Sequence, residues 1–165
     1  MKLDLFIKEY KKAADKDKFL KSHIVKTYVN YERKTALCEN IVNASMYTTE
    51  NDQKHFRQNS PVKNELTLLS LVTEYTDIEI GDTGEEMLAA FNELNKEGVF
   101  GGIISNIPET EYVEFTTLLD MVTDDFLANE RDLISYIETK ARLIVESLGG
   151  IDGLMNMIKI PTENK

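Results

Sequence analysis

The densest group of potentially reactive side chains is acidic: Asp120, Asp124, Asp125 and Glu130. Asp120 and Asp124 are four residues apart, so on a helix their carboxylates share one face about 6 Å apart. Divalent cations take oxygen ligands at such a spacing. Carboxylate metal sites in helical bundles, however, also use Glu-x-x-His pairs from facing helices, and the sequence contains no such pair. We interpret Asp120, Asp124 and Asp125 as a surface that is either solvated or partner-facing, and predict no metal and no cofactor.

The other candidate groups for chemistry are two histidines, His23 and His55, and one cysteine, Cys38. A zinc site or a thiol–imidazole pair would require these side chains to converge. Cys38 shares an apolar helical face with Leu37 and Ile41, where a cysteine usually packs as a small hydrophobic residue. The sequence shows no catalytic signature, and we predict that the protein is not an enzyme.

Helical periodicity dominates the segments that must position these residues. Apolar side chains recur at three- and four-residue intervals from residue 3 onward. Helix starts are predicted by caps at Asp15 or Asp17, at Asn30, at Ser60 followed by Pro61, and at Asp82 or Thr83. Residues 46–58 change to a strand, polar turn, strand pattern, which predicts a small β-hairpin. The expected fold is all-α, a bundle of about six helices with one hairpin insert.

The acidic residues fall on the longest predicted helical stretch. One apolar face extends from Tyr112 to Phe126 and a second from Leu133 to Leu148, with a predicted break near Asn129. Residues 99–104 are a short apolar piece with two glycines, and residues 151–160 predict a last short helix. We expect a single helical domain over residues 1–160 and a polar tail at 161–165.

That last predicted helix is also the strongest candidate for an exposed apolar docking site. Its apolar residues stand close to a chain end and follow two glycines. The predicted partner-binding residues there are Ile151, Leu154, Met155 and Ile158.

Charge is divided unevenly along the chain. Residues 1–63 contain 13 Lys+Arg and 8 Asp+Glu, whereas residues 64–165 contain 6 and 21, for a formal net charge of −10. This asymmetry favours a partner with a basic face, or contact between copies of the chain. It disfavours direct nucleic-acid binding, which depends on Lys and Arg. Acidity that serves only solubility predicts the same composition.

Two further observations predict where in the cell the protein is located. No apolar stretch approaches the roughly 20 residues that span a bilayer, so we expect no membrane association. A single cysteine is typical of a reducing compartment, which predicts a cytoplasmic protein.

Several segments together resemble a known family. They are residues 18–25 (KFLKSHIV), 28–32 (YVNYE), 59–61 (NSP), 75–79 (YTDIE), 91–94 (FNEL), 121–125 (MVTDD) and 129–132 (NERD). In these segments the chain resembles small acidic proteins encoded by phages and prophages of low-GC Gram-positive bacteria. The resemblance implies a phage origin and supplies no catalytic residues.

From this resemblance we expect a structural or assembly accessory protein that acts by protein–protein contacts. Its partners would be neck, tail or capsid proteins, or further copies of itself. It would work in the host cytoplasm during assembly, with the virion as a second location. The alternative is a soluble acidic inhibitor of a host or defence protein, with carboxylates that mimic nucleic-acid phosphates.

Overall fold

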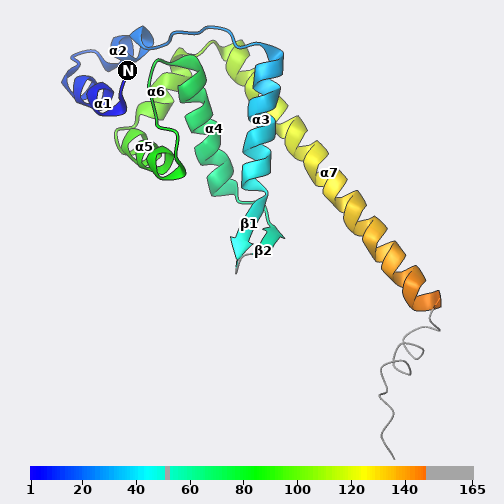
Figure 1. Cartoon of the computed structure of the whole chain (residues 1–165). Coiled ribbons are helices and arrows are strands. Elements are labelled where there is room, and N and C mark those ends of the chain that lie inside the picture. Colours follow the sequence, from blue (N-terminus) through cyan, green and yellow to red (C-terminus); the bar gives the residue numbers. More distant parts are fainter. Residues whose placement is uncertain (51–52, 148–165) are drawn as a thin grey trace, which may run out of the picture. The chain divides into compact units, whose positions relative to one another are not determined.

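The computed structural model describes residues 1–50 and 53–147, which form seven α-helices and one pair of short strands (Figure 1). In chain order these are α1 (Leu3–Lys12), α2 (Lys16–Ser22), α3 (Tyr31–Ser45), β1 (Tyr47–Glu50), β2 (Gln53–Phe56), α4 (Ser60–Tyr75), α5 (Gly84–Lys96), α6 (Val99–Asn106) and α7 (Glu109–Ser147). The predicted all-α class with one hairpin is confirmed. The apolar piece that begins at Val99 is itself a helix, α6, and the helix predicted at 151–160 lies outside the described residues.

Three of the four predicted caps are confirmed. The side chain of Asp15 accepts from the backbone N–H of Lys18, and that of Asn30 accepts from Arg33. Thr83 forms a capping box with Glu86, so each side chain binds the other residue's backbone N–H. The fourth prediction, a Ser60 cap for α4, is wrong, because the capping residue stands one position earlier.

At α4 the cap is Asn59, whose Oδ1 accepts from Val62 N at 3.2 Å. Ser60 is already the first helical residue and Pro61 the second. An asparagine side chain caps as well as a serine does. Adjacent Asn and Ser are therefore indistinguishable as caps from sequence alone.

The hairpin lies inside the predicted range. Strands β1 and β2 pair antiparallel with Tyr47 opposite Phe56, and their ring centroids lie 6.1 Å apart. The backbone N–H of Arg57 donates to Met46 O at 3.0 Å, and that of Asn59 donates to Ser45 O at 2.7 Å. These bonds hold the base of the hairpin between α3 and α4.

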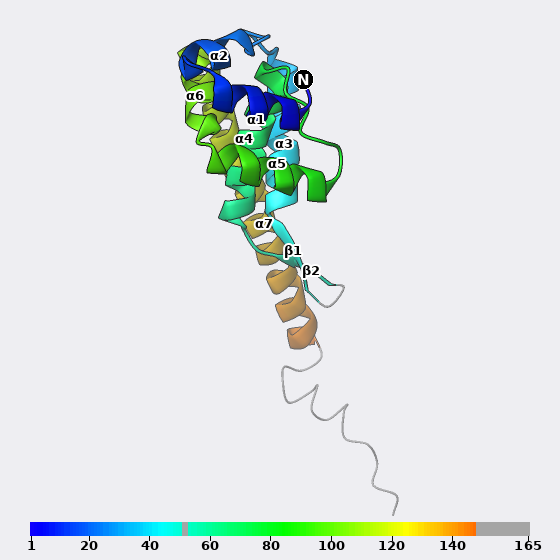
Figure 2. The ribbon, with the colours of Figure 1, turned by 90° about the vertical axis from the view of Figure 1, so that its left-hand side faces the viewer.

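The chain divides into two compact units, Met1–Thr123 and Asp124–Lys165. In the first unit α3 and α4 lie side by side, and α1 lies against α5 (Figures 1 and 2). Its core contains fully buried apolar side chains from most helices, among them Phe6, Leu69, Val72, Tyr75, Leu94, Val99 and Phe115. The single-domain interpretation of residues 1–160 stays a prediction.

The predicted break near Asn129 is wrong, because α7 is one helix from Glu109 to Ser147. No glycine or proline occurs anywhere in this helix. Asn129 is flanked by Ala128 and Glu130, both good helix formers, and an interior asparagine costs less than about 0.7 kcal/mol. A single residue of moderate propensity is too weak a signal to end a helix.

Two adjacent glycines of α6 have different surroundings. A Cβ added at Gly102 would lie 2.2 Å from Cδ1 of Leu20, which is 3% exposed. A Cβ added at Gly101 would meet nothing within 4 Å. Gly102 therefore allows the close approach of α2 and α6, whereas Gly101 does not serve this contact.

We predict opposite effects of alanine at these two positions. Gly101→Ala should raise the free energy of unfolding by about 0.5–1 kcal/mol, because alanine favours a helix over glycine. Gly102→Ala should lower the free energy of unfolding by about 1–2 kcal/mol, because overpacking outweighs that gain. Urea unfolding followed by circular dichroism measures both, and equal stabilisation by the two variants would show that Leu20 moves aside freely.

Candidate interaction site

The first unit contains a buried network of charged side chains centred on Lys34. Lys34 lies on α3 and is 0% exposed, and its ammonium group pairs with two carboxylates of α7. The Nζ–Oε2 distance to Glu111 is 2.9 Å, and Glu114 is the second partner. The ring of Tyr28 lies over the same ammonium, with its centroid 5.4 Å away. An ammonium group buried this deeply is tolerated only when it is paired in this way.

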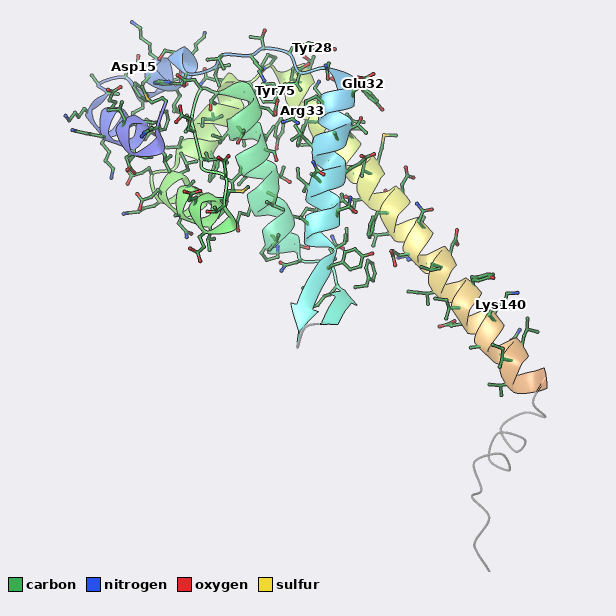
Figure 3. All side chains as sticks on the ribbon, in the orientation of Figure 1. Asp15, Tyr28, Glu32, Arg33, Tyr75 and Lys140 are labelled. Atoms are coloured by element: carbon green, nitrogen blue, oxygen red, sulfur yellow. The ribbon has the colours of Figure 1, made fainter. Side chains whose placement is uncertain are left out.

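Glu111 is the point where three chain segments meet. Besides Lys34, its Oε2 accepts from the backbone N–H of Val29 at 3.0 Å and from the hydroxyl of Tyr75 at 2.9 Å. These contacts join the loop before α3 and the end of α4 to the first turn of α7. In Figure 3, Tyr75 and Tyr28 appear close to the start of α3.

The pKa shifts in this network favour the charged forms of Lys34 and Glu111. Burial alone would raise the pKa of Glu111, but the hydrogen bonds from Lys34, Val29 and Tyr75 lower it overall. Burial would lower the pKa of Lys34, and its bonds to Glu114 and Glu111 raise it overall. Burial, together with the bond to Glu111, raises the pKa of the Tyr75 hydroxyl. A catalytic base or nucleophile needs a pKa near neutrality, so we interpret the network as a structural lock.

A second buried carboxylate, Glu74, lies beside the lock. It is 5% exposed and pairs with Lys26 at 3.3 Å and with Arg33, whose Nε lies 2.9 Å from Glu74 Oε1. Burial opposes its ionisation, yet these two cations lower the pKa of Glu74 overall. Glu74, Lys26 and Arg33 line a cavity of about 300 Å³, together with Tyr28, Val29 and Asn30. Within this cavity the carboxylate of Glu74 is paired with the two cations, Lys26 and Arg33.

Sequence reasoning missed this network, although the spacing contains a signal. Lys34 stands four residues before Cys38, on the apolar face of α3, and Glu111 stands four residues before Phe115 on α7. A charged residue that falls on the apolar face of a helix either marks the edge of that face or is buried beside an oppositely charged partner. Only the three-dimensional structure shows that the two out-of-place charges meet.

Of the four acidic residues singled out in the sequence, Asp120, Asp124 and Asp125 are exposed and Glu130 is half-buried. Asp120 belongs to the first unit and lines a cavity of about 330 Å³ with Lys63, Thr67 and Thr116. Asp124 and Asp125 belong to the second unit and are exposed there. Within residues 1–50 and 53–147, no three His, Cys, Asp or Glu side chains are placed to hold a metal ion.

His23 and Cys38 have separate structural surroundings. His23 Nδ1 lies 2.8 Å from Asp77 Oδ1, and its ring packs against Phe6 and Phe19. Cys38 is fully buried, with its Sγ 3.8 Å from the carbonyl oxygen of Phe115. Burial raises the pKa of the Cys38 thiol to about 11, which removes the thiolate that nucleophilic chemistry needs. The interpretation of Cys38 as a buried packing residue is confirmed, and the side chain of His55 lies outside the described residues.

The described part of the second unit is the α7 segment from residue 124 to 147, and it carries exposed apolar side chains. We call the set Leu127, Leu133, Ile134, Ile137, Ala141 and Ile144 the apolar stripe. The exposed fractions are 52% for Leu133, 46% for Ile134, 55% for Ile137 and 59% for Ile144. Large apolar residues repeated along one helix face at this exposure indicate a surface for another protein segment. The prediction for Ile151, Leu154, Met155 and Ile158 lies outside the described residues.

No protein-family model matches the chain, and neither a curated protein nor a solved structure matches it. Among the described helices, none combines the length and apolar character needed to cross a bilayer.

The lock yields a prediction for stability and its pH dependence. Glu111→Gln should lower the free energy of unfolding by about 2–4 kcal/mol, because it removes the buried carboxylate that Lys34, the backbone N–H of Val29 and the hydroxyl of Tyr75 all bind. Glu114→Gln is the matched control, since the side chain of Glu114 is 43% exposed, and should cost about 1 kcal/mol or less.

The lowered pKa of Glu111 sets the sign of the acid response. Its contribution to stability is present above the ordinary glutamate value of 4.5 and is lost as the pH falls through the folded-state pKa. The wild type should therefore lose more stability between neutral and acidic pH than Glu111→Gln does. Denaturant titrations at a series of pH values measure this difference, and parallel curves for the two proteins would contradict the lock.

Proposed function

We propose that this protein acts by protein–protein contact, as an accessory component in the assembly of phage particles. The observation that carries the proposal is the apolar stripe. A helix of this length depends on packing of its apolar face for stability in water. The stripe repeats that face over several turns with its large side chains about half exposed. A partner that covers it removes this apolar surface from water.

The first unit supports a binding role in a different way. Its buried lock fixes the first turns of α7 to α3 and α4 through Glu111. The ionisable groups of the lock are held in paired, charged states, which suits a rigid anchor for a binding helix.

The phage assignment rests on the segments that resemble small acidic phage and prophage proteins, such as MVTDD at 121–125 and NERD at 129–132. Both segments lie in α7. Two of the segments that carry the resemblance therefore adjoin the proposed binding surface. Neck, tail and capsid proteins, or copies of this chain, are the expected partners.

An inhibitor of a host or defence protein is the second candidate. The exposed carboxylates of Asp120, Asp124 and Asp125, and the excess of 21 Asp+Glu over 6 Lys+Arg in residues 64–165, favour it. Such a protein would bind a basic surface, and its binding would weaken strongly with salt. Contact through the apolar stripe depends on salt much less.

Genetic complementation tests the assembly function. In a phage that encodes this chain, deletion of the gene should lower the yield of infectious particles. Wild-type protein and Leu143→Glu should restore the yield, whereas Ile137→Glu should not, because it places a charge in the apolar stripe. Leu143 is a matched control: it is 50% exposed, on the opposite side of the helix from the stripe.

Electron microscopy of the lysates identifies the step that fails, as unjoined heads and tails or incomplete particles. Normal particle yield without the gene would refute the assembly role. If the three substitutions Asp120→Lys, Asp124→Lys and Asp125→Lys abolish function while Ile137→Glu does not, the inhibitor is favoured instead.

A further inference from the structure

We infer that the apolar stripe binds the same stripe of a second copy of this chain, as an antiparallel helix pair. This inference rests on the proposed function and names the partner. It follows from the spacing of the stripe and from the charges on its border.

The stripe has the seven-residue spacing of a coiled coil. Leu127, Ile134 and Ala141 are seven residues apart, and so are Glu130, Ile137 and Ile144. These two series are the a and d positions of consecutive heptads, with Glu130 as the one charged member. A seven-residue apolar repeat on a helix matches a second helix that has the same repeat.

The charges next to the stripe select the direction of the partner. Arg131 and Glu138 occupy the same flank, one heptad apart, and both side chains are exposed. On its own helix Glu138 stands four residues before Arg142, a spacing at which the two side chains can pair. Arg131 has no acidic residue three or four positions away on its own helix, so its own helix offers it no partner in either direction.

An antiparallel pair gives Arg131 an acidic partner. With Ile134 of one copy opposite Ile137 of the other, Leu127 lies opposite Ile144 and Ala141 lies opposite Glu130. In this register Arg131 faces Glu138 of the second copy, and the twofold symmetry makes this ion pair twice. Lys140 of the second copy then lies beside Glu130. The small Ala141 leaves space for the glutamate side chain at its layer.

A parallel pair brings like charges together and forms no ion pair. In register, it places Glu130 directly against Glu130 of the second copy. It also places Glu138 beside Leu133, and Arg131 beside Phe126, so that no opposite charges meet. Like charges in contact oppose a pairing mode more strongly than exposed ion pairs favour one. The antiparallel arrangement is therefore the one that fits the sequence of the stripe.

The full-length chain tests the inference by sedimentation equilibrium over a concentration series. We expect a monomer–dimer equilibrium with a dissociation constant on the order of micromolar. Ile137→Glu should be monomeric, and Leu143→Glu should dimerise like the wild type. Far-UV circular dichroism of each variant shows whether the helices are retained. A wild-type monomer up to about 100 µM overturns the inference, including the case in which residues 148–165 cover the stripe.

A charge exchange tests the direction. Arg131→Glu should weaken the dimer about tenfold, since two attractive contacts become repulsive. Adding Glu138→Arg to the same chain should restore the affinity to within about threefold of wild type. A double variant as weak as the single variant refutes the antiparallel register.

Cysteine pairing tests the register independently. An equimolar mixture of Ile134→Cys and Ile137→Cys chains should form the mixed disulfide faster than either chain forms its own. Cys38 does not compete, because it is fully buried and its thiol pKa is about 11. Preferential homodisulfides overturn the antiparallel register.

These tests separate the inference from the proposed function. If the protein is monomeric but Ile137→Glu still blocks particle assembly, the stripe binds a different assembly protein, and only the self-pairing is refuted. If the protein dimerises as expected but Ile137→Glu supports normal particle yield, the pairing stands and the assembly role of the stripe fails.

Discussion

The first unit depends on the burial of one ammonium group. Lys34 can be 0% exposed only because Glu111 and Glu114 arrive from α7, and Glu111 can be buried only because Val29, Tyr75 and Lys34 donate to it. The loop before α3, the end of α4 and the start of α7 must therefore all be in place together. Replacement of a buried ion pair by an apolar cluster of equal volume is often neutral or stabilising, so the lock contributes directional contacts rather than extra stability. The ionic lock fixes one register of α7 against α3.

The packing around the lock explains how a helix without glycine or proline is held at its beginning. Phe115, Leu118 and Leu119 are buried on the face that continues from Glu111, and the hydroxyl of Thr123 accepts from Lys63 Nζ at 2.8 Å. Beyond Thr123 the composition stays amphipathic while the exposure rises. The same helix thus changes from a core element in the first unit to a carrier of apolar surface in the second.

The sequence contained enough information for the class of fold and for three of the four caps predicted from it. Caps at Asp15, Asn30 and Thr83 are local chemistry, readable from neighbouring residues, and the hairpin follows from a local change of period. Two errors came from weak local signals: the break at Asn129, and the cap at Ser60 rather than Asn59. The lock was beyond sequence reasoning because Lys34 and Glu111 are distant along the chain, and their meeting is a property of the whole fold. The exposure of Asp120, Asp124 and Asp125 was predictable, since charges on a helix face opposite an apolar one remain in solvent.

The position of Cys38 gives this protein an internal reporter. It is the one cysteine of the chain, and its sulfur lies against the backbone of α7 at Phe115. Because Cys38 is fully buried, a thiol reagent reaches it only when the surrounding helices open, so the rate of labelling measures opening of this part of the core in solution. Because no second thiol contributes to the signal, mass spectrometry of the intact chain can time these openings without any substitution. Labelling of Cys38 thus times the opening of the core beside the first turns of α7, the helix that carries the apolar stripe.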